Sequence, residues 1–192
     1  VLTREPVESV VERGLPGETE FGSRLISVDA LGLRFTTVYV PNGKSIEHED
    51  YPRKLAWLES LAGWLKSDGG GRPHVLCGDF NVVPEPLDSW DEAGLAGTIF
   101  HTEAERERYR AALEAGGLGD LFRAKFPAER QYSWWDYRGG AFHKRQGLRI
   151  DFLLGDAAVS GRLRSVEIDR EYRKKKGDST PSDHAPVFAD LD

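Results

Sequence analysis

Two short segments of the chain place a carboxylate next to a second polar group. In the first, Cys77-Gly78-Asp79-Phe80-Asn81, Asp79 and Asn81 are two residues apart, so an extended backbone points both side chains to one face. A carboxylate beside an amide can bind a cation, or can activate water while the amide holds a phosphate. The alternative is a turn in which the Asp79 side chain only closes a strand.

The second segment is Ser182-Asp183-His184, which precedes the apolar stretch that begins at Ala185. Its side chains suit a metal ligand at Asp183 and a hydrogen-bond donor to a phosphoryl oxygen at His184. A solvated turn with a surface histidine is the alternative.

Asp151 lies in an otherwise apolar strand, where a buried carboxylate is unfavourable unless paired. His184 is its natural partner, because an Asp–His pair fixes the imidazole tautomer. A solvent-facing Asp151 on an edge strand is the alternative.

Aromatic side chains stand beside these polar groups. Tyr39 ends a predicted strand and can offer its phenol to an anionic substrate, although core packing is the commoner role. The segment Ser133-Trp134-Trp135-Asp136-Tyr137-Arg138 alternates rings with charges. Rings of this kind stack on bases or sugars for about 1–3 kcal/mol per contact. Ordinary core packing is the alternative for one of the two tryptophans.

The composition indicates one globular domain that spans residues 1–192. Hydrophobic residues make up 39% of the chain and charged residues 30%, and no apolar run approaches the ~18 residues of a membrane span. The single cysteine, Cys77, excludes an intramolecular disulfide and a multi-cysteine zinc site, so we expect a cytoplasmic protein without membrane contact. The net charge of −6 argues against nucleic-acid binding. However, carboxylates gathered around a cation also make a protein acidic, and basic residues cluster locally at Arg170, Arg173, Lys174, Lys175 and Lys176.

Strands and helices alternate along the chain. A hairpin is predicted from Arg24–Leu31 and Leu33–Val40, joined at Gly32. A helix begins at Asp50 and stops at Gly69-Gly70-Gly71, and a second is opened by the capping-box pair Thr102 and Glu105 and runs to about Glu114. Residues 82–101 are predicted to be loop. Further strands are predicted at His74–Cys77, Arg149–Leu154, Arg162–Ile168 and Ala185–Leu191. This order favours a layered α/β or α+β domain with two packed sheets.

Five motifs, taken in order, resemble the exonuclease III family of AP endonucleases, which belongs to the endonuclease/exonuclease/phosphatase superfamily. They are Tyr39-Val40-Pro41-Asn42-Gly43, Gly78-Asp79-Phe80-Asn81, Tyr132-Ser133-Trp134-Trp135-Asp136-Tyr137-Arg138, Gly147-Leu148-Arg149-Ile150-Asp151 and Ser182-Asp183-His184-Ala185-Pro186-Val187. The resemblance covers nearly the whole chain. It implies a four-layer α/β/β/α sandwich of two mixed sheets flanked by helices.

The resemblance also implies roles for individual residues. Asp79 would activate the attacking water, Asn81 would hold the phosphate, and His184, oriented by Asp151, would hydrogen-bond the scissile phosphate. Tyr39 would contact the phosphate or assist deprotonation. The implied ligands of Mg²⁺, with Mn²⁺ as an alternative ion, are Asp183, Asp79 and Asn81. The implied DNA-binding set, in which Trp134, Leu148 and Ile150 form the pocket for a flipped-out abasic sugar, also includes Arg24, Lys54, Arg138 and Arg149.

The implied activity is Mg²⁺-dependent cleavage of double-stranded DNA at abasic sites or 3′ ends by a monomer, with 3′-phosphatase activity as an addition. The family opens with a metal-associated Asn and a Gln-Glu motif that supplies a principal metal ligand, and neither occurs here. We therefore expect that Val1-Leu2-Thr3-Arg4 aligns with a later strand and that the N-terminal strands and helices are absent. Two alternatives remain: a phosphatase of the same superfamily that acts on a non-DNA phosphoester, and a catalytically incompetent DNA-binding fragment.

Overall fold

Six strands form the larger of two sheets in the computed structural model, which describes residues 1–192 apart from 19, 21, 68–70, 175–176 and 178. They are β1 (Ser9–Arg13), β2 (Leu25–Ala30), β3 (Leu33–Tyr39), β4 (His74–Asp79), β5 (Gly119–Asp120) and β6 (Asp151–Gly155). Their order is β1-β2-β3-β4-β6-β5, and only β3 and β4 run parallel. A parallel pair requires a crossover, which the helix between these two strands provides.

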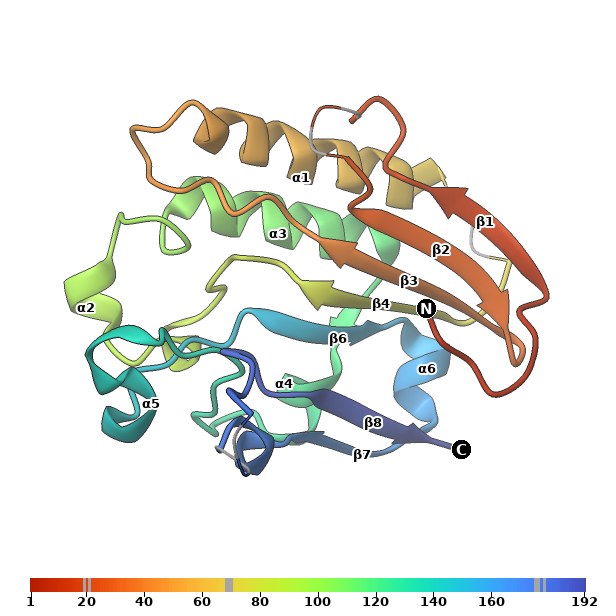
Figure 1. The fold of residues 1–192 in the computed structure, drawn as a ribbon. Coiled ribbons are helices and arrows are strands. Elements are labelled where there is room, and N and C mark those ends of the chain that lie inside the picture. Colours follow the sequence, from red (N-terminus) through yellow and green to blue (C-terminus); the bar gives the residue numbers. More distant parts are fainter. Residues whose placement is uncertain (19, 21, 68–70, 175–176, 178) are drawn as a thin grey trace.

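Two long helices, α1 (Asp50–Ser67) and α3 (Glu103–Gly116), cover one face of this sheet (Figure 1). Trp57, Leu58 and Leu61 of α1 are fully buried in the core that both helices share with the sheet. The predicted capping box is confirmed at the start of α3, where Thr102 and Glu105 bond reciprocally to each other's backbone. The apolar faces of α1 and α3 are buried against the sheet, and this packing fixes the central strands whose ends carry polar residues.

The smaller sheet pairs β7 (Leu163–Ile168) with β8 (Val187–Leu191) in antiparallel fashion. The short helix α4 (Leu121–Lys125) contacts both β6 and β7 and so links the two sheets, while α6 (Ala157–Gly161) contacts β4 and β6. The predicted α/β class with two sheets and helices is confirmed. The remaining elements are short: η1 (Pro86–Asp88), α2 (Glu92–Leu95), η2 (Arg138–Gly140), α5 (Ala141–Lys144) and η3 (Arg170–Arg173).

Several boundaries differ from the sequence-based expectations. The predicted hairpin is confirmed as β2 and β3, whereas the segment 82–101 contains η1 and α2 rather than loop alone. The expected strand at Val1-Leu2-Thr3-Arg4 is wrong, because these residues are exposed and form no strand, and the first strand is β1. Gly69 and Gly70, Lys175 and Lys176 lie outside the described residues. None of the described helices is long and apolar enough to cross a membrane.

Candidate active site

Three of the predicted site residues lie in one row across the larger sheet. Tyr39 of β3 is paired in register with Asp79 of β4, and Asp79 is paired with Asp151 of β6. The close approach of β3 to β4 depends on Gly78, which has φ of 136°, and a Cβ atom there would lie 1.9 Å from the Val38 carbonyl oxygen. The row therefore follows from strand pairing, and glycine is required beside it.

Asn81 fixes the carboxylate of Asp79. The Asn81 backbone N–H donates to Asp79 Oδ1 at 2.9 Å, and Asn81 Nδ2 donates to Asp79 Oδ2 at 3.2 Å and to the Val40 carbonyl at 3.0 Å. Asn81 is buried and has φ of 49°, a left-handed conformation that asparagine tolerates better than most residues. The turn considered from the sequence is thus present, and it also orients the carboxylate.

The predicted pairing of Asp151 with His184 is confirmed. His184 Nδ1 lies 2.9 Å from Asp151 Oδ2, and the two side chains are 32% and 18% exposed. Burial lowers the pKa of His184, but the hydrogen bond and charge of Asp151, together with the charges of Asp79 and Asp183, raise that pKa above its ordinary value overall. Since Nδ1 faces Asp151, Nε2 is the ring nitrogen left for a ligand.

The carboxylates of this cluster are held close together in partly buried surroundings. One ligand atom each from Asp79, Asp151 and His184 can be chosen so that all lie within 4.8 Å of one another. Burial and the nearby charge of Asp151 raise the pKa of Asp79 to about 7. A bound cation would relieve both effects, and hard oxygen donors of this kind suit Mg²⁺. The residues present therefore fit a divalent metal ion.

Asp183 is placed differently from the other three. Its Oδ2 accepts a hydrogen bond of 3.0 Å from Trp134 Nε1, and it is not part of the group within 4.8 Å. Trp134 in turn forms isolated β-bridges with His184 and Leu148. Of the predicted metal ligands, Asp79 therefore lies within this group and Asp183 lies beside it, while Asp151, predicted as the partner of His184, also lies within the group.

A pocket of about 460 Å³ opens next to Trp134. Trp134 and Leu148 line it together with Trp90 and Phe100, and Arg138 stands at its edge, where its exposed guanidinium pairs with Asp136. Ile150 is 2% exposed and packs with Leu148 and Trp134 rather than lining this pocket. Two of the three residues expected to receive an abasic sugar therefore share one pocket wall, and Ile150 supports it.

Lys54 and Arg149, which were expected to contact DNA, are both buried in this structure. Lys54 is 0% exposed, and its ammonium group bonds Glu105 and the carbonyl oxygens of Asn42 and Asn81. Arg149 is 1% exposed and is paired with two carboxylates, those of Asp88 and Asp120. Both cations hold buried elements together, so DNA cannot reach them without rearrangement.

Arg24 and Tyr39 instead form an accessible pair at the edge of the site. Tyr39 is 51% exposed, and the Arg24 guanidinium lies 4.6 Å from the centre of its ring. Arg24 Nη1 also donates to the Tyr39 carbonyl at 3.2 Å. The ring is therefore held at the surface beside a cation, which suits contact with an anionic substrate.

Two residues that support the site were not predicted as site residues. Asn42 Nδ2 donates to Asn81 Oδ1 at 3.2 Å, and Ser133 Oγ accepts from the backbone N–H groups of Ile150 and Asp151, each at 3.1 Å. Ser133 is fully buried. Both belong to the motifs that carry the family resemblance, and this membership was the available signal for a supporting role.

A two-sheet α/β domain in which carboxylates, an amide and a histidine meet at strand ends has the arrangement of a hydrolase that acts with a metal ion. The chain belongs to the endonuclease/exonuclease/phosphatase family, whose model matches residues 1–184.

Its relatives place it near DNA nucleases within that family. It is 30% identical to an exodeoxyribonuclease of Bacillus subtilis over 186 residues, which cover 96% of this chain and 69% of the relative. It is 31% identical to exodeoxyribonuclease III of Haemophilus influenzae, across 100% of this chain and 75% of the relative. These relatives confirm the resemblance to the exonuclease III family.

Solved structures agree with the sequence relatives. A structure of the 3′ phosphatase NExo from Neisseria, bound to a product DNA hairpin, superposes with a TM-score of 0.92 at 32% identity and covers 99% of this chain and 73% of its own. An AP endonuclease from Archaeoglobus fulgidus gives a TM-score of 0.90 at 34% identity and covers 98% and 72%. The fold expectation is confirmed by these two neighbours.

Proposed function

We propose that this chain is a Mg²⁺-dependent DNA phosphodiesterase that acts at abasic sites or 3′ ends during repair. The observation that carries the proposal is the convergence of Asp79, Asp151 and His184 within 4.8 Å at the end of the central strands. Support comes from relatives named as exodeoxyribonucleases and from a structural neighbour bound to a DNA hairpin.

In the proposed reaction, Asp79 accepts a proton from the attacking water. Asn81 keeps the Asp79 carboxylate oriented through two hydrogen bonds and helps to hold the phosphate, and a bound cation would lower the pKa of Asp79 and keep it in the charged form that accepts a proton. His184, held by Asp151 through Nδ1, presents Nε2 as a donor to a phosphoryl oxygen. Tyr39 contacts the same phosphate from the neighbouring strand.

Asp79 and Asp151 would hold Mg²⁺ in this proposal, with Asp183 beside them, and their close approach supports this assignment. When bound, the ion supplies positive charge that offsets the charge on the phosphate and the leaving oxygen. Mn²⁺ offers the same preference for oxygen ligands and is the alternative ion.

Cleavage of a duplex that carries one abasic-site analogue is expected to require added Mg²⁺. EDTA should abolish incision, and excess Mg²⁺ should restore it. Without the ion, the site loses the positive charge that offsets the repulsion between its negative carboxylates and the negative phosphate. Labelled strands resolved on a denaturing gel measure the effect, with an undamaged duplex as control. Incision that persists in EDTA contradicts the metal requirement. Hydrolysis restricted to a non-DNA phosphoester favours the phosphatase alternative, and metal-independent DNA binding without cleavage favours the incompetent alternative.

Replacement of Trp134 by alanine is expected to reduce incision at an abasic analogue more strongly than removal of a 3′ phosphate. The indole forms part of the wall of the 460 Å³ pocket and donates to Asp183. Trp134→Phe is the matched control, because it keeps a ring in the pocket wall but removes the N–H donor. We expect Trp134→Phe to retain most of the preference for abasic DNA. An equal loss on every substrate would instead assign Trp134 a structural role.

A further inference from the structure

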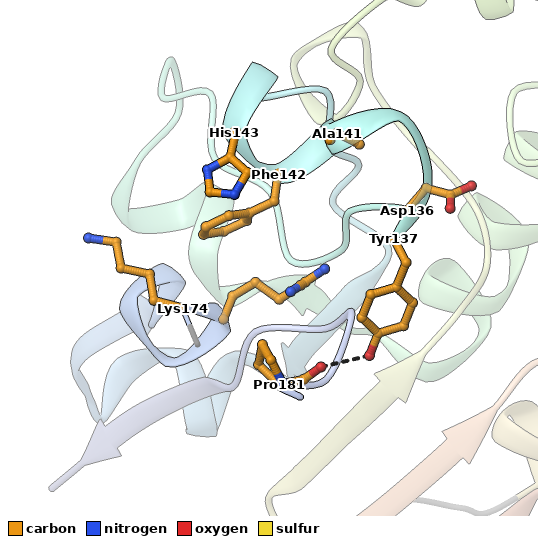
Figure 2. A pocket seen from close by; sticks show the side chains of 9 residues that line it. Asp136, Tyr137, Ala141, Phe142, His143, Lys174 and Pro181 are labelled. Carbon is orange, nitrogen blue, oxygen red and sulfur yellow. Dashed lines mark hydrogen bonds between the residues drawn. The ribbon is translucent and has the colours of Figure 1, made fainter. Parts of the chain in front are cut away.

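A second pocket, of about 290 Å³, lies beside the candidate active site and contains a buried cation (Figure 2). Phe142 and His143 stand on one side of it and Tyr137 on the other, and Lys174 stands at one edge. Arg173, the last residue of η3, also lines the pocket and is only 7% exposed. Its guanidinium carbon lies 4.8 Å from the ring centre of Tyr137 and 5.2 Å from that of Phe142.

The charge of Arg173 has no anionic partner among the described residues. Its buried Nε lacks a hydrogen-bond partner, and no ion pair joins its guanidinium to a described carboxylate. The carboxylates nearby are already occupied: Asp136 pairs with Arg138, and Glu171 pairs with Lys174. Stacking on two rings offsets only part of the desolvation of a buried cation. Within the described part of the chain, the pocket therefore presents a pre-oriented positive charge without an anionic partner.

Further arginines line an adjoining pocket, whose Trp135 ring packs against the Phe142 ring of the Arg173 pocket. Arg170 lies 4.1 Å from the ring centre of Phe142 and donates to its carbonyl oxygen. With Arg130 and Arg145, Arg170 also lines this adjoining pocket of about 230 Å³, which contains no carboxylate among its lining residues. Several cations that line two pockets suit a polyanion better than a single small anion. This local charge opposes the net charge of −6 of the whole chain.

The cationic pocket is joined to the candidate active site. The Tyr137 hydroxyl donates to the Pro181 carbonyl at 2.7 Å, which ties the pocket wall to the loop that leads to Asp183 and His184 (Figure 2). Tyr137 also follows Trp134 by three residues in the same segment. A ligand in the pocket is therefore held in a fixed relation to the residues proposed to act on DNA.

We propose that the Arg173 pocket binds a backbone phosphate of the DNA strand at a position other than the cleaved one. The planar guanidinium matches phosphate oxygens in geometry, and Lys174 and His143 at the rim add donors. The inference rests on the proposed function, because it assumes that the polyanion is the DNA substrate. It assigns Arg173 to substrate positioning and not to the chemical step.

The test is the salt dependence of DNA binding, measured by fluorescence anisotropy in EDTA so that no cleavage occurs. For Arg173→Gln, the slope of log Kd against log salt concentration is expected to fall by about 1, the loss of one phosphate contact. Between about 50 and about 200 mM salt, Kd of this variant should then rise about 3.5-fold less than that of the wild type. Arg173→Lys, which keeps the charge, should retain the wild-type slope.

Lys66→Gln in the last turn of α1 is the matched control, since it removes one positive charge from an exposed side chain outside the pocket. An Arg173→Gln slope equal to that of Lys66→Gln overturns the proposal. If circular dichroism shows Arg173→Gln unfolded, Lys174→Gln at the exposed rim takes its place under the same criterion.

A second experiment titrates inorganic phosphate and follows the ³¹P line width, which distinguishes a free anion from the DNA backbone as the ligand. Phosphate binding with an unchanged DNA slope assigns the pocket to a free anion and overturns the proposal.

Incision of abasic DNA by the same wild-type preparation, with Mg²⁺ added, separates this inference from the proposed function. If the wild type cleaves abasic DNA but the salt slope of Arg173→Gln is unchanged, the phosphate subsite is rejected and the proposed enzymatic function stands. If the slope falls but the wild type does not cleave, the subsite stands and the proposed enzymatic function is rejected.

Discussion

Exchange of Asp79 for asparagine is expected to lower kcat for incision of abasic DNA by about 10²–10⁴-fold and to leave Kd for DNA nearly unchanged. The two side chains have the same shape, so the row of Tyr39, Asp79 and Asp151 across the sheet should persist. The variant, however, loses the carboxylate that accepts the proton from water. Single-turnover incision rates and anisotropy titrations of the same duplex measure the two quantities separately.

Asp190→Asn provides the matched control for that experiment. Asp190 is an exposed carboxylate on β8 that accepts a hydrogen bond from Ser165 and lies outside the candidate site. Its replacement should leave both kcat and Kd at wild-type values. If Asp79→Asn turned over at the rate of Asp190→Asn, proton transfer would have to be assigned to another group, and the central step of the proposed reaction would be wrong.

The parts of the fold that were predicted correctly carry strong local signals. The capping box of Thr102 and Glu105 and the turn at Gly32, with φ of 74°, depend on residues that are close in sequence. By contrast, β1 lacks the alternation of buried and exposed residues that indicates a strand, since four of its five residues are exposed. Its pairing with β2 is a tertiary contact, which local patterns do not encode.

The pairing of Asp151 with His184 could be predicted because a carboxylate in an apolar strand needs a partner. The internal role of Arg149 could not, since its partners Asp88 and Asp120 are 61 and 29 residues away in the sequence. Lys54 is an intermediate case. It precedes Leu58 by four residues and Leu61 by seven, a helical spacing that places Lys54 on the buried stripe of α1. The spacing was visible in the sequence, but the resemblance to the family favoured a surface role.

Substitution of Lys54 by methionine is expected to lower the free energy of unfolding by about 3–5 kcal/mol, because it leaves the buried charge of Glu105 without its partner. Incision should also weaken, since Lys54 Nζ donates to the Asn81 carbonyl at 2.6 Å and so supports the residue that orients Asp79. Urea denaturation followed by circular dichroism measures the change in stability.

The double variant Lys54→Met/Glu105→Gln separates the internal ion pair from a contact with DNA. The backbone N–H groups of Phe100 and Thr102 donate to Oε1 and Oε2 of Glu105 in the native protein. Glutamine at position 105 removes the unpaired charge and retains a carbonyl oxygen for one of these two donors. The double variant should therefore recover much of the lost stability, and the double-mutant cycle should show strong coupling between the two positions. Because Lys54 is 0% exposed, DNA affinity measured on folded protein should change little. If a variant at position 54 instead had the stability of the wild type but bound DNA more weakly, Lys54 would be assigned a direct contact with DNA.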